Sequence, residues 1–171
     1  FAAMGYRVFV FEYRGYGKSS GLFLSFRNAV KDTVSSALFA YDQKMPLFLI
    51  GHSMGGYSSL SALDELKDKV KGVCVYAPFR SPFSAMHVCA SKMGWKGLVA
   101  ELFIYPFQVL SSPFKANKSL IGTINRTKTP ILVIQGEKDQ EVSLDGCSIL
   151  KKVNKIKSPY LCIQIEKEEE S

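Results

Sequence analysis

The sequence contains little of what metal centres, disulfide frameworks and membrane spans require. Its 171 residues include two histidines, and its four cysteines form no Cys-x-x-Cys pair. Both facts argue against a zinc site. The uncharged, apolar stretch from Leu102 to Phe114 contains two prolines and is too short to cross a membrane. Cys74 and Cys162 fall in apolar strand patterns, so we expect buried free thiols, which a reducing, cytosolic setting would suit.

The basic charge is scattered and indicates no nucleic-acid partner. The formal net charge is +7, yet the only loose cluster comprises Lys151, Lys152, Lys155 and Lys157. On a predicted helix this spacing is more typical of a solvated face than of a phosphate-binding stripe. The oligomeric state is not indicated.

The two ends of the sequence suggest a segment of a longer protein. The chain opens on Phe1 rather than methionine, in what resembles the end of a helix, and it stops in an acidic run after a strand pattern. Its length suits one domain with a substantial core. We therefore expect residues 1–171 to form a single, partial domain.

Short apolar runs alternate with segments of helical period along most of the chain. The predicted strands are Arg7–Tyr13, Leu47–Ile50, Val70–Ala77, Pro130–Gly136 and Tyr160–Ile165. The predicted helices are Ser25–Lys44, with Ser25 as N-cap, Met54–Lys67 and Leu144–Asn154. This alternation predicts an α/β fold with a mostly parallel sheet of about five strands flanked by helices.

Residues 78–129 interrupt that rhythm. The segment holds Trp95, Leu98, Leu102 and Phe103 near helical spacing, together with several prolines. A structureless loop of this length is uncommon in a compact domain, so we expect a small helical cap. The cap either adds to the core or acts as a lid over an apolar pocket, and its place in the chain favours the lid.

The stretch "LFLIGHSMGG" predicts a nucleophile elbow centred on Ser53. A strand precedes this serine, a helix follows it, and Gly51 and Gly55 lie two residues to either side. Glycines at these positions would relieve crowding in a sharp turn. The backbone N–H of Met54, at the start of the helix, could stabilise an oxyanion. The alternative is a glycine-rich turn that serves packing alone.

Asp139 is the best candidate for the acid that orients a catalytic base. It follows the strand Pro130–Gly136 by three residues, at the same sheet edge as Ser53. Glu137 is a weaker candidate because it lies too near the strand, and Asp145 because it falls on the next predicted helix. Asp139 could instead be a turn or N-cap residue.

No histidine of the sequence suits the role of the base that a serine nucleophile needs. In an elbow His52 points away from the Ser53 hydroxyl, and His87 lies at the start of the predicted cap. A triad in the order Ser, Asp, His would place its histidine after the last strand. We therefore expect that histidine beyond Ser171, unless it has been lost.

Three stretches, "FVFEYRGYGKSSG", "LFLIGHSMGG" and "ILVIQGEKDQEVS", together resemble the α/β-hydrolase superfamily, and within it the serine aminopeptidase and monoglyceride-lipase-like hydrolases. The resemblance implies Ser53 as nucleophile, Asp139 as triad acid and the Met54 N–H as one oxyanion donor. Such proteins have about eight strands, so the remaining strands and the second oxyanion donor are expected before Phe1. One of those strands would lie between Arg7–Tyr13 and Leu47–Ile50, and without it two apolar edges would be open.

The leading functional hypothesis is a serine hydrolase that cleaves an ester, thioester or amide and needs no cofactor. Its expected substrate is a small molecule, or a peptide or lipid ester, with an acyl chain or apolar side chain. The segment alone is expected to fold poorly and to have little activity. The alternatives are a non-catalytic binding or scaffold protein that lacks the triad histidine, and an acyl transferase that uses an acceptor other than water.

Overall fold

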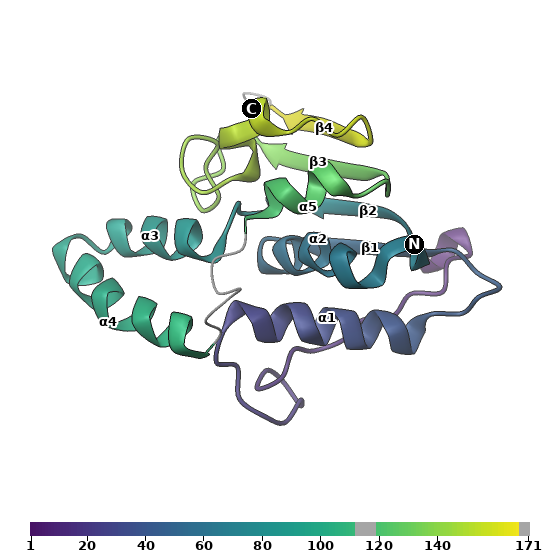
Figure 1. Ribbon diagram of the computed structural model, residues 1–171, viewed down its shortest axis with the longest axis horizontal. Coiled ribbons are helices and arrows are strands. Elements are labelled where there is room, and N and C mark those ends of the chain that lie inside the picture. Colours follow the sequence, from purple (N-terminus) through teal and green to yellow (C-terminus); the bar gives the residue numbers. More distant parts are fainter. Residues whose placement is uncertain (112–118, 168–171) are drawn as a thin grey trace.

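The computed structural model describes residues 1–111 and 119–167, and the sheet of this part has four parallel strands. The strands are β1 (Leu47–His52), β2 (Val70–Tyr76), β3 (Ile131–Gly136) and β4 (Leu161–Glu166), and they pair in chain order (Figure 1). His52 pairs with Tyr76, and Tyr76 pairs with Ile134. The carboxyl ends of neighbouring strands are therefore level, and the loops that follow them share one edge of the sheet.

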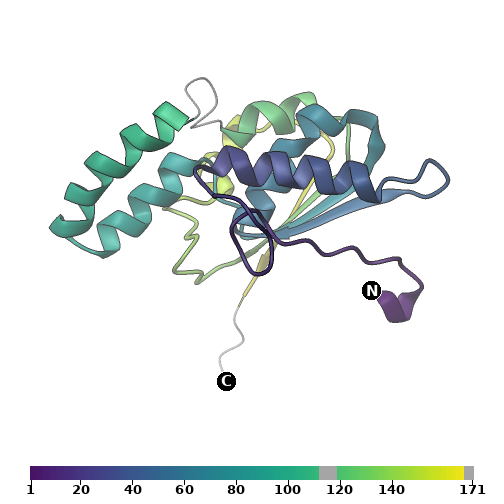
Figure 2. The same cartoon turned by 90° about the horizontal axis from the view of Figure 1, so that it is seen from below.

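The helices gather on one face of this sheet and at one side of it. Figure 2 shows α1 (Phe26–Ala40), α2 (Met54–Leu66) and α5 (Leu120–Arg126) over the same face. The remaining helical elements are η1 (Ala2–Met4), η2 (Lys67–Lys69), α3 (Pro82–Lys92), α4 (Trp95–Ser111) and η3 (Ile149–Lys155). The predicted partial α/β-hydrolase architecture, a parallel sheet flanked by helices, is confirmed.

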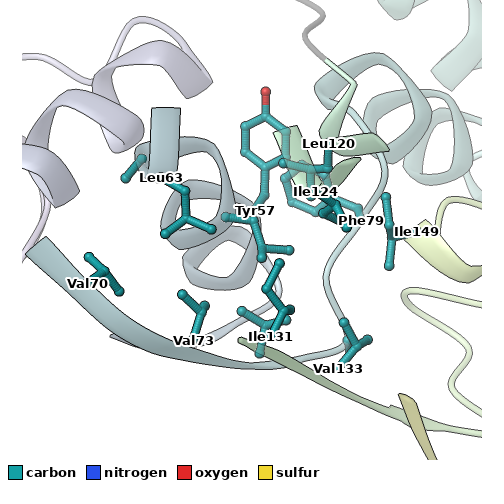
Figure 3. Close-up of a cluster of buried hydrophobic side chains, with 14 of the residues drawn as sticks. Tyr57, Leu63, Val70, Val73, Phe79, Leu120, Ile124, Ile131, Val133 and Ile149 are labelled. Carbon is teal, nitrogen blue, oxygen red and sulfur yellow. The ribbon is translucent and has the colours of Figure 1, made fainter. Parts of the chain in front are cut away.

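The core fills the space between this helical layer and the central strands (Figure 3). Leu60 and Leu63 of α2 and Ile124 of α5 are buried above Val75 and Val133 of the sheet. Strands buried on a helix-covered face favour β-branched residues, which pack well on a pleated surface. The near-continuous apolar runs of β2 and β3 follow from this packing.

The helix α1 begins where the sequence predicts. The side-chain oxygen of Asn28 accepts hydrogen bonds from the backbone N–H groups of Ser25 and Leu24, both at 3.0 Å. This arrangement satisfies N–H groups that the start of a helix would otherwise leave unpaired. The helix ends at Ala40, four residues before the predicted end at Lys44, because Tyr41 adopts an extended conformation.

The opposite face of the sheet carries exposed apolar side chains. Phe48 and Ile50 of β1 are 51% and 59% exposed, and Cys162 of β4 is exposed too. The expected burial of Cys162 is therefore wrong, while Cys74 is half-buried. All four cysteines are free thiols.

The predicted strand Arg7–Tyr13 is wrong, since this segment forms no ladder in the structure. Val8, Phe9 and Val10 remain exposed, Val10 to 84%. A strand needs a neighbour for its backbone N–H and C=O groups. Within the described part of the chain no strand lies between this segment and β1, which is the situation that the resemblance to hydrolases anticipated. The sheet has four strands instead of five for this reason.

The predicted helix Leu144–Asn154 is also wrong in its first half. Residues 144–147 form turns, and η3 starts only at Ile149, after Ser148, whose side chain accepts a hydrogen bond from the N–H of Leu150. Lys152 has a non-helical conformation, with φ −123° and ψ 34°. The turns connect the loop that holds Asp139 to the core.

Most described residues of the segment 78–129 lie in the helices α3, α4 and α5, and residues 112–118 lie outside the described residues. Helices α3 and α4 form a pair that projects to one side of the sheet (Figure 1), and α5 returns to the core. Large apolar side chains of α4 are exposed: Trp95, Leu102 and Phe103. The role of this segment as a lid stays a prediction. Among the described residues, no helix has both the length and the apolar character needed to cross a membrane.

Candidate active site

Ser53 joins β1 to α2 with an unusual backbone conformation. Its φ is 49° and its ψ is −110°, a region that residues with a Cβ rarely occupy. Its N–H donates to the carbonyl of Tyr76 and its own carbonyl accepts from the N–H of Tyr57, both at 2.9 Å. Such strain persists only where the surrounding structure enforces it, and it is common at functional sites. The local geometry of Ser53 is thus that of a strained strand-to-helix turn.

The glycines beside Ser53 differ in what they do. A Cβ on Gly51 would lie 2.4 Å from the carbonyl carbon and oxygen of Gly55, and 2.7 Å from the nitrogen of Gly56. These are backbone atoms, so crowding accounts for Gly51. A Cβ on Gly55 would meet only the Tyr13 hydroxyl, at 3.7 Å. The expectation that crowding also requires glycine at position 55 is therefore wrong for the described structure.

Met54 is the first residue of α2, and its N–H is the donor that we expect to face an oxyanion. The first N–H groups of a helix have no acceptor within the helix and lie at its positive end. Met54 is half-buried directly after Ser53. Its place fits the predicted role, which stays a prediction.

Asp139 lies in the loop after β3 and is held by three hydrogen bonds. Its Oδ1 accepts from the backbone N–H groups of Glu141 and Val142, at 2.9 and 2.8 Å. Its Oδ2 accepts from the side-chain amide of Gln135, at 3.2 Å. The carboxylate is half-buried and its orientation is well defined.

Tyr76 connects the environments of Ser53 and Asp139. Its carbonyl binds the N–H of Ser53, and its side chain lines an open pocket of about 230 Å³ together with Gly136 and Asp139. The other residues that line the pocket are Glu137, Lys138, Glu166 and Lys167. The level strand ends bring the pocket residues to the sheet edge at which Ser53 follows β1. That Ser53 and Asp139 act together stays a prediction. The sequence reasoning missed Tyr76, although its position at the end of a predicted strand was a signal.

The two weaker acid candidates have different surroundings. Glu137 is exposed on the rim of the same pocket, and its N–H donates to the carbonyl of Glu166. Asp145 is exposed in a turn rather than on the expected helix. Among the three acids only Asp139 is half-buried and held by donors on both carboxylate oxygens.

Neither histidine hydrogen bonds to Ser53 or Asp139 within the described residues. His52 lies on the same sheet face as Phe48 and Ile50, with its ring 5.4 Å from that of Tyr76. His87 of α3 stacks on Phe83, and its Nδ1 lies 3.0 Å from Oε2 of Glu101 on α4. In residues 1–111 and 119–167 no three His, Cys, Asp or Glu side chains are grouped closely enough to hold a metal ion.

Tyr13 contacts α2, which follows the elbow, and Arg14 contacts α1. The Tyr13 hydroxyl lies 2.8 Å from the Ser58 hydroxyl, which donates to the carbonyl of Gly55. Arg14 binds Asp32 of α1 through its backbone N–H and its guanidinium. Burial opposes ionisation of Asp32, but the hydrogen bonds and charge of Arg14 outweigh it and lower the pKa of this carboxyl.

One comparison with known proteins identifies the family of the chain. The sequence model of the family described as serine aminopeptidase, S33, matches residues 1–103, more than half of the chain. A comparison with curated proteins found no match.

Solved structures with the same fold include lipases and esterases. A monoacylglycerol lipase from Paleococcus ferrophilus is similar at 20% identity and a TM-score of 0.51, over 88% of this chain and 68% of the other. An esterase from Pyrococcus furiosus is similar at 18% identity and a TM-score of 0.63, over 92% and 60%. Alpha/beta hydrolase domain-containing protein 10 from mouse has 17% identity and a TM-score of 0.58, over 92% and 67%. At these identities the likeness shows the fold alone.

Proposed function

Because the chain belongs to the hydrolase family described as serine aminopeptidase, S33, we propose that it is a serine hydrolase with Ser53 as nucleophile. The observation that carries this proposal is the conformation of Ser53, a residue with a Cβ and φ 49° between a strand and a helix. A packing turn gains nothing from a strained serine. A nucleophile gains from it, because the turn presents the hydroxyl at the helix N-terminus.

The proposed reaction proceeds through an acyl-enzyme. The Ser53 oxygen attacks the carbonyl carbon of an ester, thioester or amide and gives its proton to a base. The Met54 N–H donates to the oxyanion of the tetrahedral intermediate. The base gives this proton to the leaving group, which departs. The base then takes a proton from the water that attacks the acyl-enzyme, and it returns that proton to the Ser53 oxygen as the acid product leaves. Asp139 orients the base and stabilises its protonated form.

Asp139 suits the acid role better than Glu137 or Asp145. The N–H groups of Glu141 and Val142 occupy Oδ1 and hold the carboxylate in place. Oδ2 keeps capacity for one more donor on the pocket side, since a carboxylate has about four acceptor positions. A base with an N–H group could bind there.

The base itself is not His52 or His87 in this proposal. His52 lies on the face of β1 that carries Phe48 and Ile50 and has no hydrogen bond to Ser53 or Asp139 within the described residues, and His87 is paired with Glu101. That observation favours a second candidate function, a binding or scaffold protein with a hydrolase fold and no catalysis. The two candidates differ in the reactivity of Ser53, because a serine without a base is a weak nucleophile.

We propose that α3 and α4, within the segment 78–129, form a cap and that the substrate carries an acyl chain or apolar side chain. The exposed side chains of Leu98, Leu102 and Phe103 on α4 supply apolar surface beside the sheet. Two of the structural relatives are a monoacylglycerol lipase and an esterase, which fits a carboxylic ester.

Labelling with a fluorophosphonate probe tests the proposal without knowledge of the substrate. We expect the folded, full-length protein to be labelled at Ser53 and its Ser53→Ala variant to be unlabelled. Ser59→Ala, which removes another serine of α2, is the matched control and should be labelled like the wild type. A folded, full-length wild type that takes up no probe at Ser53 would support the scaffold function and contradict the hydrolase.

A further inference from the structure

The side chain of Gln135 is the largest polar group buried completely in the described core. It belongs to β3, has no exposed surface and faces the loop that carries Asp139. Burying a carboxamide costs free energy unless all its hydrogen-bonding atoms find partners. Its partners therefore show what the residue does.

Both N–H groups of this carboxamide and its oxygen have hydrogen-bond partners. Nε2 donates to the carbonyl of Val142 at 3.0 Å and to Oδ2 of Asp139 at 3.2 Å. Oε1 accepts from the hydroxyl of Ser148 at 2.9 Å. Ser148 is itself completely buried.

These partners leave one orientation of the amide. The Val142 carbonyl and the Asp139 carboxylate are both acceptors, so only the NH₂ end of Gln135 can face them. The Ser148 hydroxyl accepts from the N–H of Leu150, so its own hydrogen remains for Oε1. A flipped amide would place Oε1 against two acceptors.

The far end of this chain of hydrogen bonds is tied to the segment after β2. Ser148 forms an antiparallel bridge with Phe79, and the N–H of Arg80 donates to the carbonyl of Cys147 at 2.7 Å. The backbone around Ser148 thus fixes its hydroxyl. The hydroxyl fixes the amide of Gln135, and that amide in turn binds Asp139.

We infer that Gln135 is a positioning residue for Asp139, which it holds by Oδ2 from inside the core while Ser148 fixes the orientation of its amide. This inference rests on the proposed function, in which Asp139 orients the base. The backbone N–H groups of Glu141 and Val142 hold Oδ1, and the Gln135 donor restrains the second oxygen. With both oxygens held, the remaining acceptor position of Oδ2 is directed to the pocket.

The alternative is that Gln135 only satisfies the Val142 carbonyl and stabilises the loop. The two roles separate when the labelling rate of Ser53 is expressed per folded molecule. A purely structural residue changes the folded fraction. A positioning residue also changes the rate of the molecules that remain folded, because the base is misoriented.

The test compares fluorophosphonate labelling rates of the wild type and three variants at a temperature where each is folded by circular dichroism. Gln135→Met removes the donors and keeps the shape. Gln135→Glu keeps an acceptor for Ser148 but sets an oxygen against Asp139. Ile124→Ala, in the core on α5, is the control for lost stability.

We expect Gln135→Met to label about tenfold more slowly per folded molecule, as for loss of one hydrogen bond to a charged group. Ile124→Ala should match the wild type. Gln135→Glu should be slow at neutral pH and approach the wild type as the pH falls, because its carboxyl group then gains a proton and can donate to Oδ2.

Equal rates per folded molecule for Gln135→Met and the wild type would overturn the positioning role and leave the proposed function intact. The positioning role would also be overturned if the labelling rate of Gln135→Glu, divided by that of the wild type, did not change with pH. If the folded wild type is not labelled at Ser53, the proposed function fails and the positioning role fails with it.

Discussion

Replacing Gly51 by alanine should strongly destabilise the protein, whereas the same change at Gly55 should not. In the Gly51→Ala variant the new Cβ would lie 2.4 Å from the carbonyl carbon of Gly55. Ordinary carbon–carbon contacts are about 3.5 to 4.0 Å, so the overlap exceeds about 1 Å. The opposing atoms belong to the backbone of the first turn of α2, so no side-chain rotation can relieve it.

The magnitude follows from the cost of overpacking. Added methyl groups in a well-packed region cost about 1–3 kcal/mol and occasionally more. Because the overlap is with backbone atoms, we expect the loss at Gly51→Ala to be about 3 kcal/mol or greater. At Gly55 the nearest atom is 3.7 Å away, and alanine is favoured over glycine in helices by up to about 1 kcal/mol. Gly55→Ala should therefore be neutral or slightly stabilising.

Urea unfolding of the two variants and the wild type measures both values, with equal m-values as the sign that the unfolded states are alike. The labelling rate of Ser53 gives a second readout, because a displaced first turn of α2 moves the Ser53 hydroxyl and the Met54 N–H together. The steric argument is refuted if Gly51→Ala costs less than about 1 kcal/mol. Equal losses at the two positions would show that Gly55 is constrained by something other than the neighbours described.

Three further predictions concern ionisation. Burial is the main reason that the pKa of Tyr57 is raised to about 12. As the pH rises, the unfolded chain loses the phenol proton before the folded protein does, so the free energy of unfolding should fall between about pH 10 and 12. Urea titrations of Tyr57→Phe should show a smaller fall over this range. Because Arg14 lowers the pKa of Asp32, this pair should stabilise the protein at neutral pH and cease to do so as the pH drops below 3.8. Asp32→Asn should cost about 1 kcal/mol at pH 7, given a half-exposed Arg14, and should remove that acid dependence. A thiol reagent should modify exposed Cys162 quickly and buried Cys147, whose pKa burial raises, only on unfolding, and the opposite order would contradict the burial pattern.

The sequence predicted the elements whose patterns depend on near neighbours. The strands that became β1 to β4 and the start of α1 at Phe26 follow from runs of apolar residues and from Ser25 as N-cap. Their burial comes from helices and strands close to them in the chain. Local pattern and tertiary packing agree there, so the prediction holds.

The errors fall where the outcome depends on distant partners. Residues 7–13 have a strand pattern, but a pattern cannot supply the neighbouring strand that a ladder requires. Residues 144–147 have helical spacing, yet Gly146 and the bridge between Ser148 and Phe79 commit them to turns. The sequence likewise pointed to Asp139 and not to Gln135. A glutamine in an apolar strand was visible in the sequence, but its partners lie 4 to 13 positions away, in a loop whose path the sequence does not reveal.

The two proposed site residues are held by different kinds of interaction, so their failures should differ. Ser53 is placed by sterics: the close approach of Gly51 to the backbone of Gly55 fixes the turn, and a substitution at Gly51 acts on the fold as a whole. Asp139 is placed by hydrogen bonds to Glu141, Val142 and Gln135, and loss of one of them leaves the backbone where it is. Defects at the elbow should therefore lower stability and reactivity together, whereas defects around Asp139 should lower the reactivity of molecules that remain folded. A substitution that lowers reactivity without lowering stability therefore acts through Asp139, and one that lowers both acts through the elbow.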